Sequence, residues 1–81
     1  MSPERAFDAV RDAVVVVMEV APDAVTRDTR LVTDLRCDSL ALVEIAEILE
    51  ERLTGLTIDD ADLDGIETVG QAADYVAGRA P

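Results

Sequence analysis

The chain has 81 residues, enough for a single domain over residues 1–81, and 49 % of them are apolar, so a core can form despite a net charge of −11. A surface this negative repels a phosphate backbone, which excludes nucleic-acid binding. The chain also has no histidine, and this removes the commonest general base and the commonest metal ligand.

An amphipathic helix is predicted to begin after Ser2. Ser2 is a favourable N-cap residue, and Pro3 suits the first helical position. The valine run 14–17 alone would suit a strand, but the apolar residues that lead into it recur at helical spacing. We expect Pro22 to end this helix. The apolar stripe consists of Phe7, Val10, Val14, Val17 and Met18.

A long loop is predicted over residues 21–37, because this stretch has no helical period. Its apolar residues Val25, Leu31 and Leu35 are spaced too widely for one helical face, so we expect them to pin the loop to the core. Loops of this length are usually functional or flexible, and this one has room for a short helical turn.

The clearest helix is predicted over residues 39–53, with Gly55 as its C-terminal stop. One face is suited to the core and carries Leu42, Ile45, Ala46, Leu49 and Leu53. A second face mixes apolar and acidic residues, namely Leu40, Val43, Glu44, Glu47, Ile48 and Glu51. This second face is either a docking surface or a widened core stripe, and the pattern leaves both interpretations open.

The last helix is predicted to begin at Thr68 and to stop at Gly78. Thr68 and Gln71 match a capping box. Residues 56–67 before it are consistent with a loop that contains one helical turn. We therefore expect an all-α fold, a small four-helix bundle of three main helices and one short helix, without strand pairs. The inner face of the last helix is Val69, Ala72, Ala73 and Val76.

Most of the excess negative charge falls in residues 38–67, which hold ten acidic residues and a single base, Arg52. A partner with a basic patch would be steered toward such a region. A solvated acidic face that keeps the protein in solution is the simpler alternative.

Cys37 is the only cysteine, so no internal disulfide forms, which fits a reducing compartment. Because Arg36 is its one basic neighbour, we interpret Cys37 as a small, partly buried apolar residue rather than a reactive thiol. No apolar run approaches the ~20 residues of a membrane span, and the N-terminus lacks the pattern of a signal peptide. We expect a cytoplasmic protein without membrane contact.

Ser39 stands where the long loop meets a helix start, between Asp38 and Leu40. Backbone N–H groups at a helix start favour a nearby phosphate, while ordinary capping by Asp38 or Ser39 is the structural alternative. The chain has neither His nor Lys to activate this hydroxyl, so it is not a serine hydrolase. If Ser39 reacts, another enzyme supplies the base.

The acidic segment Asp60, Asp62, Asp64 and Gly65 resembles the start of a calcium loop. The loop fails at its twelfth position, where Gln71 stands in place of a bidentate glutamate. An unmodified acidic module that binds calcium or a protein remains the alternative of a different class, but we predict no specific metal site.

The triplet Asp38-Ser39-Leu40 resembles that of the acyl carrier proteins, and the match extends over almost the whole chain. The resemblance implies that a phosphopantetheinyl transferase attaches 4′-phosphopantetheine from coenzyme A to Ser39, with Asp38 beside the transfer site. It also implies a non-catalytic, monomeric carrier of acyl thioesters. Further elements follow in family order: Leu31, Asp34-Leu35, the acidic helix 40–53, Ile58, Ile66 and residues 68–76.

The same resemblance assigns partner docking to the mixed face of the second helix, from Leu40 to Glu51. The partners it implies are an acyltransferase, a ketosynthase and tailoring enzymes with basic docking patches. Acyl chains of the family enter the bundle core, which implies a pocket lined by Leu49, Ile66 and Ala72.

Two departures from the family pattern stand out. Arg36 occupies a position that is usually glycine, and Glu47 one that is commonly apolar in fatty-acid carriers. The segment 38–42 followed by Glu44 looks most like a discrete carrier of a type II polyketide synthase. Alternatives within the class are a peptidyl or aryl carrier of nonribosomal peptide synthesis and a carrier of fatty-acid synthesis.

Overall fold

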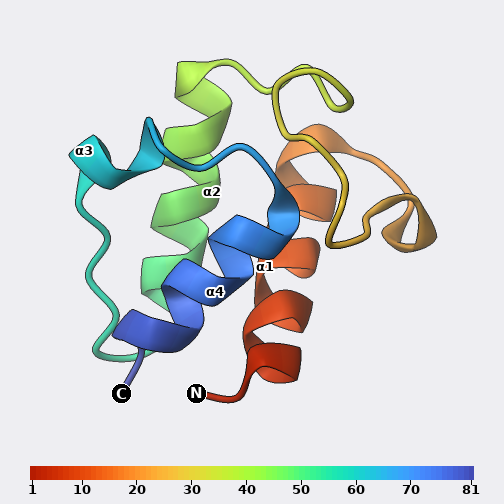
Figure 1. The fold of residues 1–81 in the computed structure, drawn as a ribbon. Coiled ribbons are helices and arrows are strands. Elements are labelled where there is room, and N and C mark those ends of the chain that lie inside the picture. The colour runs from red at the N-terminus through yellow and green to blue at the C-terminus, as the bar shows by residue number, and fades with distance from the viewer.

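Three long helices and one short helix make up the fold in a computed structural model that describes all 81 residues (Figure 1). The long α1 packs against both α2 and α4, and the predicted all-α bundle is confirmed. None of the helices combines the length and the apolar character that a membrane crossing requires. The elements are α1 (Pro3–Met18), the 3-10 helix η1 (Pro22–Ala24), α2 (Ser39–Arg52), α3 (Asp60–Leu63) and α4 (Val69–Arg79).

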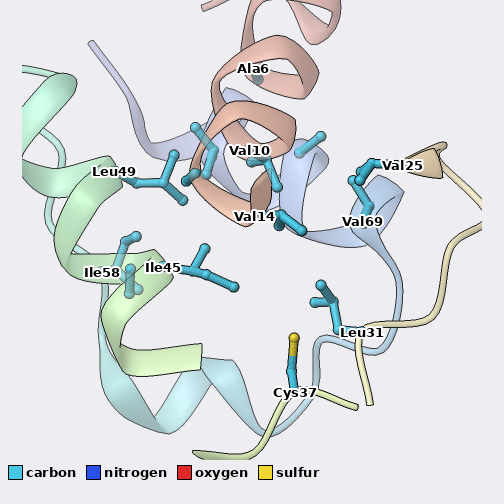
Figure 2. Close-up of a cluster of buried hydrophobic side chains, with 14 of the residues drawn as sticks. Ala6, Val10, Val14, Val25, Leu31, Cys37, Ile45, Leu49, Ile58 and Val69 are labelled. Atoms are coloured by element: carbon cyan, nitrogen blue, oxygen red, sulfur yellow. The ribbon is translucent and has the colours of Figure 1, made fainter. Parts of the chain in front are cut away.

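The core forms where the predicted apolar faces of the three long helices meet (Figure 2). The α1 face is made of small residues, and this lets α4 and α2 approach closely. On α2 the predicted core face is confirmed, since its central residues are buried and Leu42 and Leu53 at its ends are half-buried. The buried helical residues are Ala6, Val10, Ala13, Val14, Ile45, Ala46, Leu49, Val69, Gly70, Ala73 and Val76.

The predicted C-terminal ends of α1 and α4 are wrong. Helix α1 stops at Met18, before Pro22, because Glu19 turns into the left-handed region (φ 55°) while its N–H donates to the Val15 carbonyl. Pro22 instead opens η1, where its fixed φ suits the first position. Helix α4 continues through Gly78 to Arg79, because a glycine close to a helix end does not itself break the hydrogen-bond ladder.

Residues 27–31 of the long loop are joined to the start of α4 by backbone hydrogen bonds. The N–H groups of Val69 and Gly70 donate to the Thr29 and Arg27 carbonyls, each at 2.9 Å, and the Leu31 N–H donates to Glu67 at 3.0 Å. An isolated antiparallel bridge pairs residues 30 and 68, a feature that the sequence did not predict. We call this set of contacts the loop–α4 seam. It fixes the loop that leads to the start of α2.

Apolar side chains of the same loop pack into the core, as predicted. Val25 and Leu31 are buried and Leu35 is half-buried. The short turn for which the loop had room is η1. Helix α2 ends at Arg52, one residue earlier than predicted, and Leu53 caps it. Gly55 (φ 88°) lies two residues beyond this cap.

Candidate functional site

Ser39 is the first residue of α2, at the end of the bundle opposite to both chain termini (Figure 1). Asp38 caps this helix, because its Oδ1 accepts a hydrogen bond from the Ala41 N–H at 2.8 Å. The Ser39 side chain is exposed and makes no hydrogen bond within the chain. The backbone N–H groups of Ser39 and Leu40 also have no partner in the chain, so they face outward beside a free hydroxyl. Of the two capping candidates, the structure selects Asp38 and leaves Ser39 available.

The residues that lead to Ser39 alternate between exposed and buried positions. Arg36 adopts a left-handed conformation (φ 59°) and is exposed, and the next residue, Cys37, is buried. The Cys37 N–H donates to the Leu31 carbonyl at 2.9 Å, and Figure 2 shows the two side chains close to each other. Burial, and secondarily the charge of Asp38, raises the pKa of the Cys37 thiol. Cys37 is therefore an unreactive apolar anchor, and its turn directs Asp38 and Ser39 outward.

The left-handed backbone at Arg36 has a measurable cost, because an L-residue there loses about 1–2 kcal/mol that glycine does not. Glycine loses more conformational entropy on folding, so Arg36→Gly should raise the free energy of unfolding by about 0.5–1 kcal/mol in urea titrations. Arg36→Ala is the matched control, since it removes the charge but keeps the backbone cost. An Arg36→Gly variant no more stable than Arg36→Ala would contradict this account.

The mixed face of α2 is only partly free. Leu40 is 65 % exposed, and the three carboxylates Glu44, Glu47 and Glu51 are exposed and form no ion pair. Ile48 packs against the core, so this position widens the core stripe. Exposed apolar surface thus remains at the Ser39 end of the helix and at the half-buried Val43. The widened core stripe is confirmed for Ile48, and docking by the exposed residues of the face stays a prediction.

A half-open apolar cavity of about 30 Å³ lies between α2, α3 and α4. The three residues predicted to line a pocket, Leu49, Ile66 and Ala72, all line it. The sequence did not reveal Tyr75, whose ring also contributes to the wall. The remaining lining residues are Leu31, Leu42, Ile45, Ala46, Ile58, Leu63 and Val76.

A larger groove of about 330 Å³ is open on the surface next to this cavity. Leu42, Leu63 and Ile66 line both the groove and the cavity, so the two adjoin at these side chains. Leu42 lies one helical turn after Ser39, which brings the groove within reach of a group attached there. The groove also contains Arg30, Val32, Thr33, Asp64 and Glu67.

The acidic segment around α3 does not form a calcium loop. Asp59 caps α3 by accepting a hydrogen bond from the Ala61 N–H at 3.1 Å, and Asp62 accepts one from the Tyr75 hydroxyl at 2.7 Å. No three acidic or cysteine side chains gather in a way that could hold a metal ion. Of the three carboxylates in the local pattern that resembled a cation site, only Asp62 has a contact within the chain, and it contributes to the fold.

Comparison with known proteins identifies the family of this chain. Residues 8–76 match the family model described as a phosphopantetheine attachment site. The chain is 39 % identical to an acyl carrier protein of Campylobacter hominis, covering 86 % of this chain and 87 % of that protein. It is 40 % identical to one of a Sulfurovum species (86 % and 92 % covered) and 37 % identical to one of Lactobacillus acidophilus (94 % of each). The chain belongs to the acyl carrier protein family, a family of non-catalytic carriers whose cofactor is phosphopantetheine.

Proposed function

We propose that Ser39 is the residue that carries 4′-phosphopantetheine, and that acyl intermediates travel as thioesters on its thiol. The observation that carries this proposal is the free hydroxyl of Ser39 beside the Asp38 cap. The only other serine, Ser2, is engaged, because its Oγ accepts a hydrogen bond from the Arg5 N–H at 3.3 Å as the cap of α1.

In the proposed transfer, Ser39 Oγ forms a bond to the phosphorus that bears the pantetheine of coenzyme A. The bond between the two phosphates of the pyrophosphate breaks, and adenosine 3′,5′-bisphosphate leaves. The hydroxyl proton passes to a base of the transferase, since this chain has no His or Lys and the Asp38 carboxylate is occupied as a cap. The outward N–H groups of Ser39 and Leu40 favour the new phosphodiester electrostatically.

The groove and the cavity provide places for the arm and for its acyl cargo. The groove begins at Leu42, one turn from Ser39, and its floor is partly apolar. The cavity behind it has only apolar side chains apart from the ring of Tyr75. We assign the groove to the arm, and the apolar cavity, which must widen to admit it, to the start of an acyl chain.

The pathway we favour is polyketide assembly or a related secondary pathway, with an acyltransferase, a ketosynthase and tailoring enzymes as partners. The segment 38–42, Glu44 and the exposed Glu47 support this assignment. The free, buried Cys37 supports a reducing, cytoplasmic compartment. Loading assays discriminate the alternatives: a malonyl-transferring enzyme should charge the modified chain, whereas an adenylating enzyme of peptide synthesis should not. If the acyl-loading enzymes of fatty-acid synthesis charge the modified chain equally well, that pathway would be favoured instead.

The attachment site is tested on the unaltered chain. The protein is incubated with coenzyme A and a broad-specificity phosphopantetheinyl transferase, and intact mass and fragment masses are measured. One phosphopantetheine should be added, and fragmentation should place it on Ser39. An unchanged mass, or an adduct on another residue, would overturn the proposal.

The acidic part of the mixed face is predicted to steer partner enzymes. Reversing Glu44 and Glu47 to lysine should slow partner reactions at low salt and have less effect at high salt, because screening shortens the reach of these charges. The measurement is the rate of acyl transfer to the modified chain across ionic strengths.

The matched control reverses Asp23 and Asp28, which are exposed, lie away from α2 and form no ion pair. This control changes net charge by the same amount and should leave the rate nearly unaltered. If both double variants slow the reaction equally, only the overall charge matters and the docking role is wrong.

A further inference from the structure

Helix α3 is the least embedded of the four α-helices. It has four residues, none of them buried, and its only apolar anchor to the core is the half-buried Leu63. Through Leu63, and with Ile66 just beyond it, α3 nevertheless lines both the surface groove and the apolar cavity. A wall with so little buried surface needs other contacts to keep it in place.

Polar contacts with α4 keep α3 in place. The Tyr75 hydroxyl donates to Asp62 Oδ2 at 2.7 Å and accepts from the Asp59 N–H at 3.4 Å. Arg79 Nη1 lies 3.8 Å from the same Asp62 oxygen, and the guanidinium lies 5.2 Å from the centroid of the Tyr75 ring. Arg79 Nε also donates to the Thr57 carbonyl at 3.0 Å. We call Tyr75, Asp62 and Arg79 the α3 latch.

Within the latch, the Tyr75–Asp62 hydrogen bond is the strongest contact. The Arg79–Asp62 pair is long, and both side chains are more than 40 % exposed, a setting in which ion pairs contribute little. The hydrogen bond joins a hydroxyl to a carboxylate at short distance, and such bonds are roughly twice as strong as neutral ones.

The cavity that α3 closes is too small for an acyl chain. Its volume of about 30 Å³ is comparable to the share of one water molecule in the liquid. Its apolar wall and its continuity with the groove through Leu42, Leu63 and Ile66 give a chain a route inward, provided that α3 moves away from α4. Entry therefore competes directly with the latch.

We propose that Tyr75 is a specificity-determining residue, because its ring lines the cavity while its hydroxyl, through Asp62, sets how readily α3 opens to longer acyl chains. This inference rests on the proposed attachment of the acyl arm at Ser39. Its first two tests use the unmodified chain, so they are decided whether or not Ser39 is loaded.

The first test is a pH titration followed by the ultraviolet absorbance of the phenolate. Tyr75 is the only tyrosine and there is no tryptophan, so the signal belongs to one residue. Burial raises the pKa of Tyr75, and the hydrogen bond to Asp62 raises it further. Asp62→Asn should therefore lower the pKa of Tyr75, whereas Asp60→Asn, which removes an acidic residue of α3 outside the latch, should leave it in place. Equal shifts in the two variants would overturn the latch.

The second test is amide hydrogen exchange in the Tyr75→Phe variant, which keeps the ring in the cavity wall and removes only the hydroxyl. Exchange over residues 60–66 should become about five- to tenfold faster, the expected effect of losing one hydrogen bond, with α1 unchanged. Unchanged exchange in residues 60–66 would overturn the proposal. A rise of the same size in α1 would also overturn it, because the variant would then have lowered global stability.

The third test uses the loaded carrier with acetyl and octanoyl thioesters, and measures their cleavage by hydroxylamine. A chain drawn into the cavity shields its thioester, so Tyr75→Phe should slow octanoyl cleavage by about fivefold and leave acetyl cleavage unchanged. Asp62→Asn should behave like Tyr75→Phe, and Asp60→Asn like the unaltered chain. Identical octanoyl cleavage in all four proteins would show that the latch does not control entry.

Discussion

Replacing Ser39 by alanine is expected to abolish phosphopantetheine loading completely, while the fold remains intact. The Ser39 hydroxyl is the attacking atom in the proposed transfer, and no other serine in the chain is free. Because Asp38 rather than Ser39 caps α2, the variant should keep its stability within about 0.5 kcal/mol. Intact mass after incubation with coenzyme A and the transferase measures loading, and urea titration measures stability.

Ser2→Ala is the matched control. It removes the other serine and weakens the cap of α1, at a cost of about 1 kcal/mol, but should load fully. Loading of the Ser39→Ala protein, or loss of loading in Ser2→Ala, would contradict the assignment.

Gly70→Ala is expected to be the most destabilising small substitution in the chain. A Cβ atom at Gly70 would lie 2.9 Å from the Arg27 carbonyl oxygen, closer than such atoms approach, and the neighbour is backbone that cannot rotate away. The hydrogen bond from the Gly70 N–H to that carbonyl would be stretched or lost. Overpacking and the lost bond together predict a loss of about 3 kcal/mol and a fall in Tm of roughly 10–20 °C.

The control is Gly78→Ala in the same helix. Nothing lies within 4 Å of the added Cβ at Gly78, so alanine should raise the stability by about 0.5 kcal/mol through helix propensity. Thermal unfolding followed by circular dichroism compares the two variants. Equal effects of both substitutions would show that the close approach of the loop to α4 is not a stability determinant.

The helices could be predicted because their information is local. Apolar spacing placed α1, α2 and α4, and the capping box at Thr68 and Gln71 is present as predicted. The errors lie at helix ends, which depend on the backbone conformation of single residues. The left-handed turn of Glu19 ends α1 three residues before Pro22, and a glutamate gives no sequence signal for that turn.

The candidate site likewise has some features that the local sequence specifies and others that it does not. Asp38 and Ser39 were identifiable from a triplet, and the positive φ of Arg36 agrees with the glycine that the resemblance to acyl carrier proteins implies at this position. The contact between Tyr75 and Asp62 joins residues 13 positions apart on separate elements, and no local pattern specifies which carboxylate of the acidic segment the tyrosine meets. Such pairings follow from tertiary packing alone.

The loop–α4 seam has a consequence for the order in which the molecule is completed. Residues 27, 29 and 31 make backbone hydrogen bonds to residues 67–70, so the loop before Ser39 gains these contacts only once α4 has formed and docked. During synthesis the serine emerges well before these partners do, and the helices that precede it cannot position it alone. Under the proposed attachment at Ser39, a transferase that recognises the ordered approach to this serine would therefore act on folded chains in preference to nascent ones.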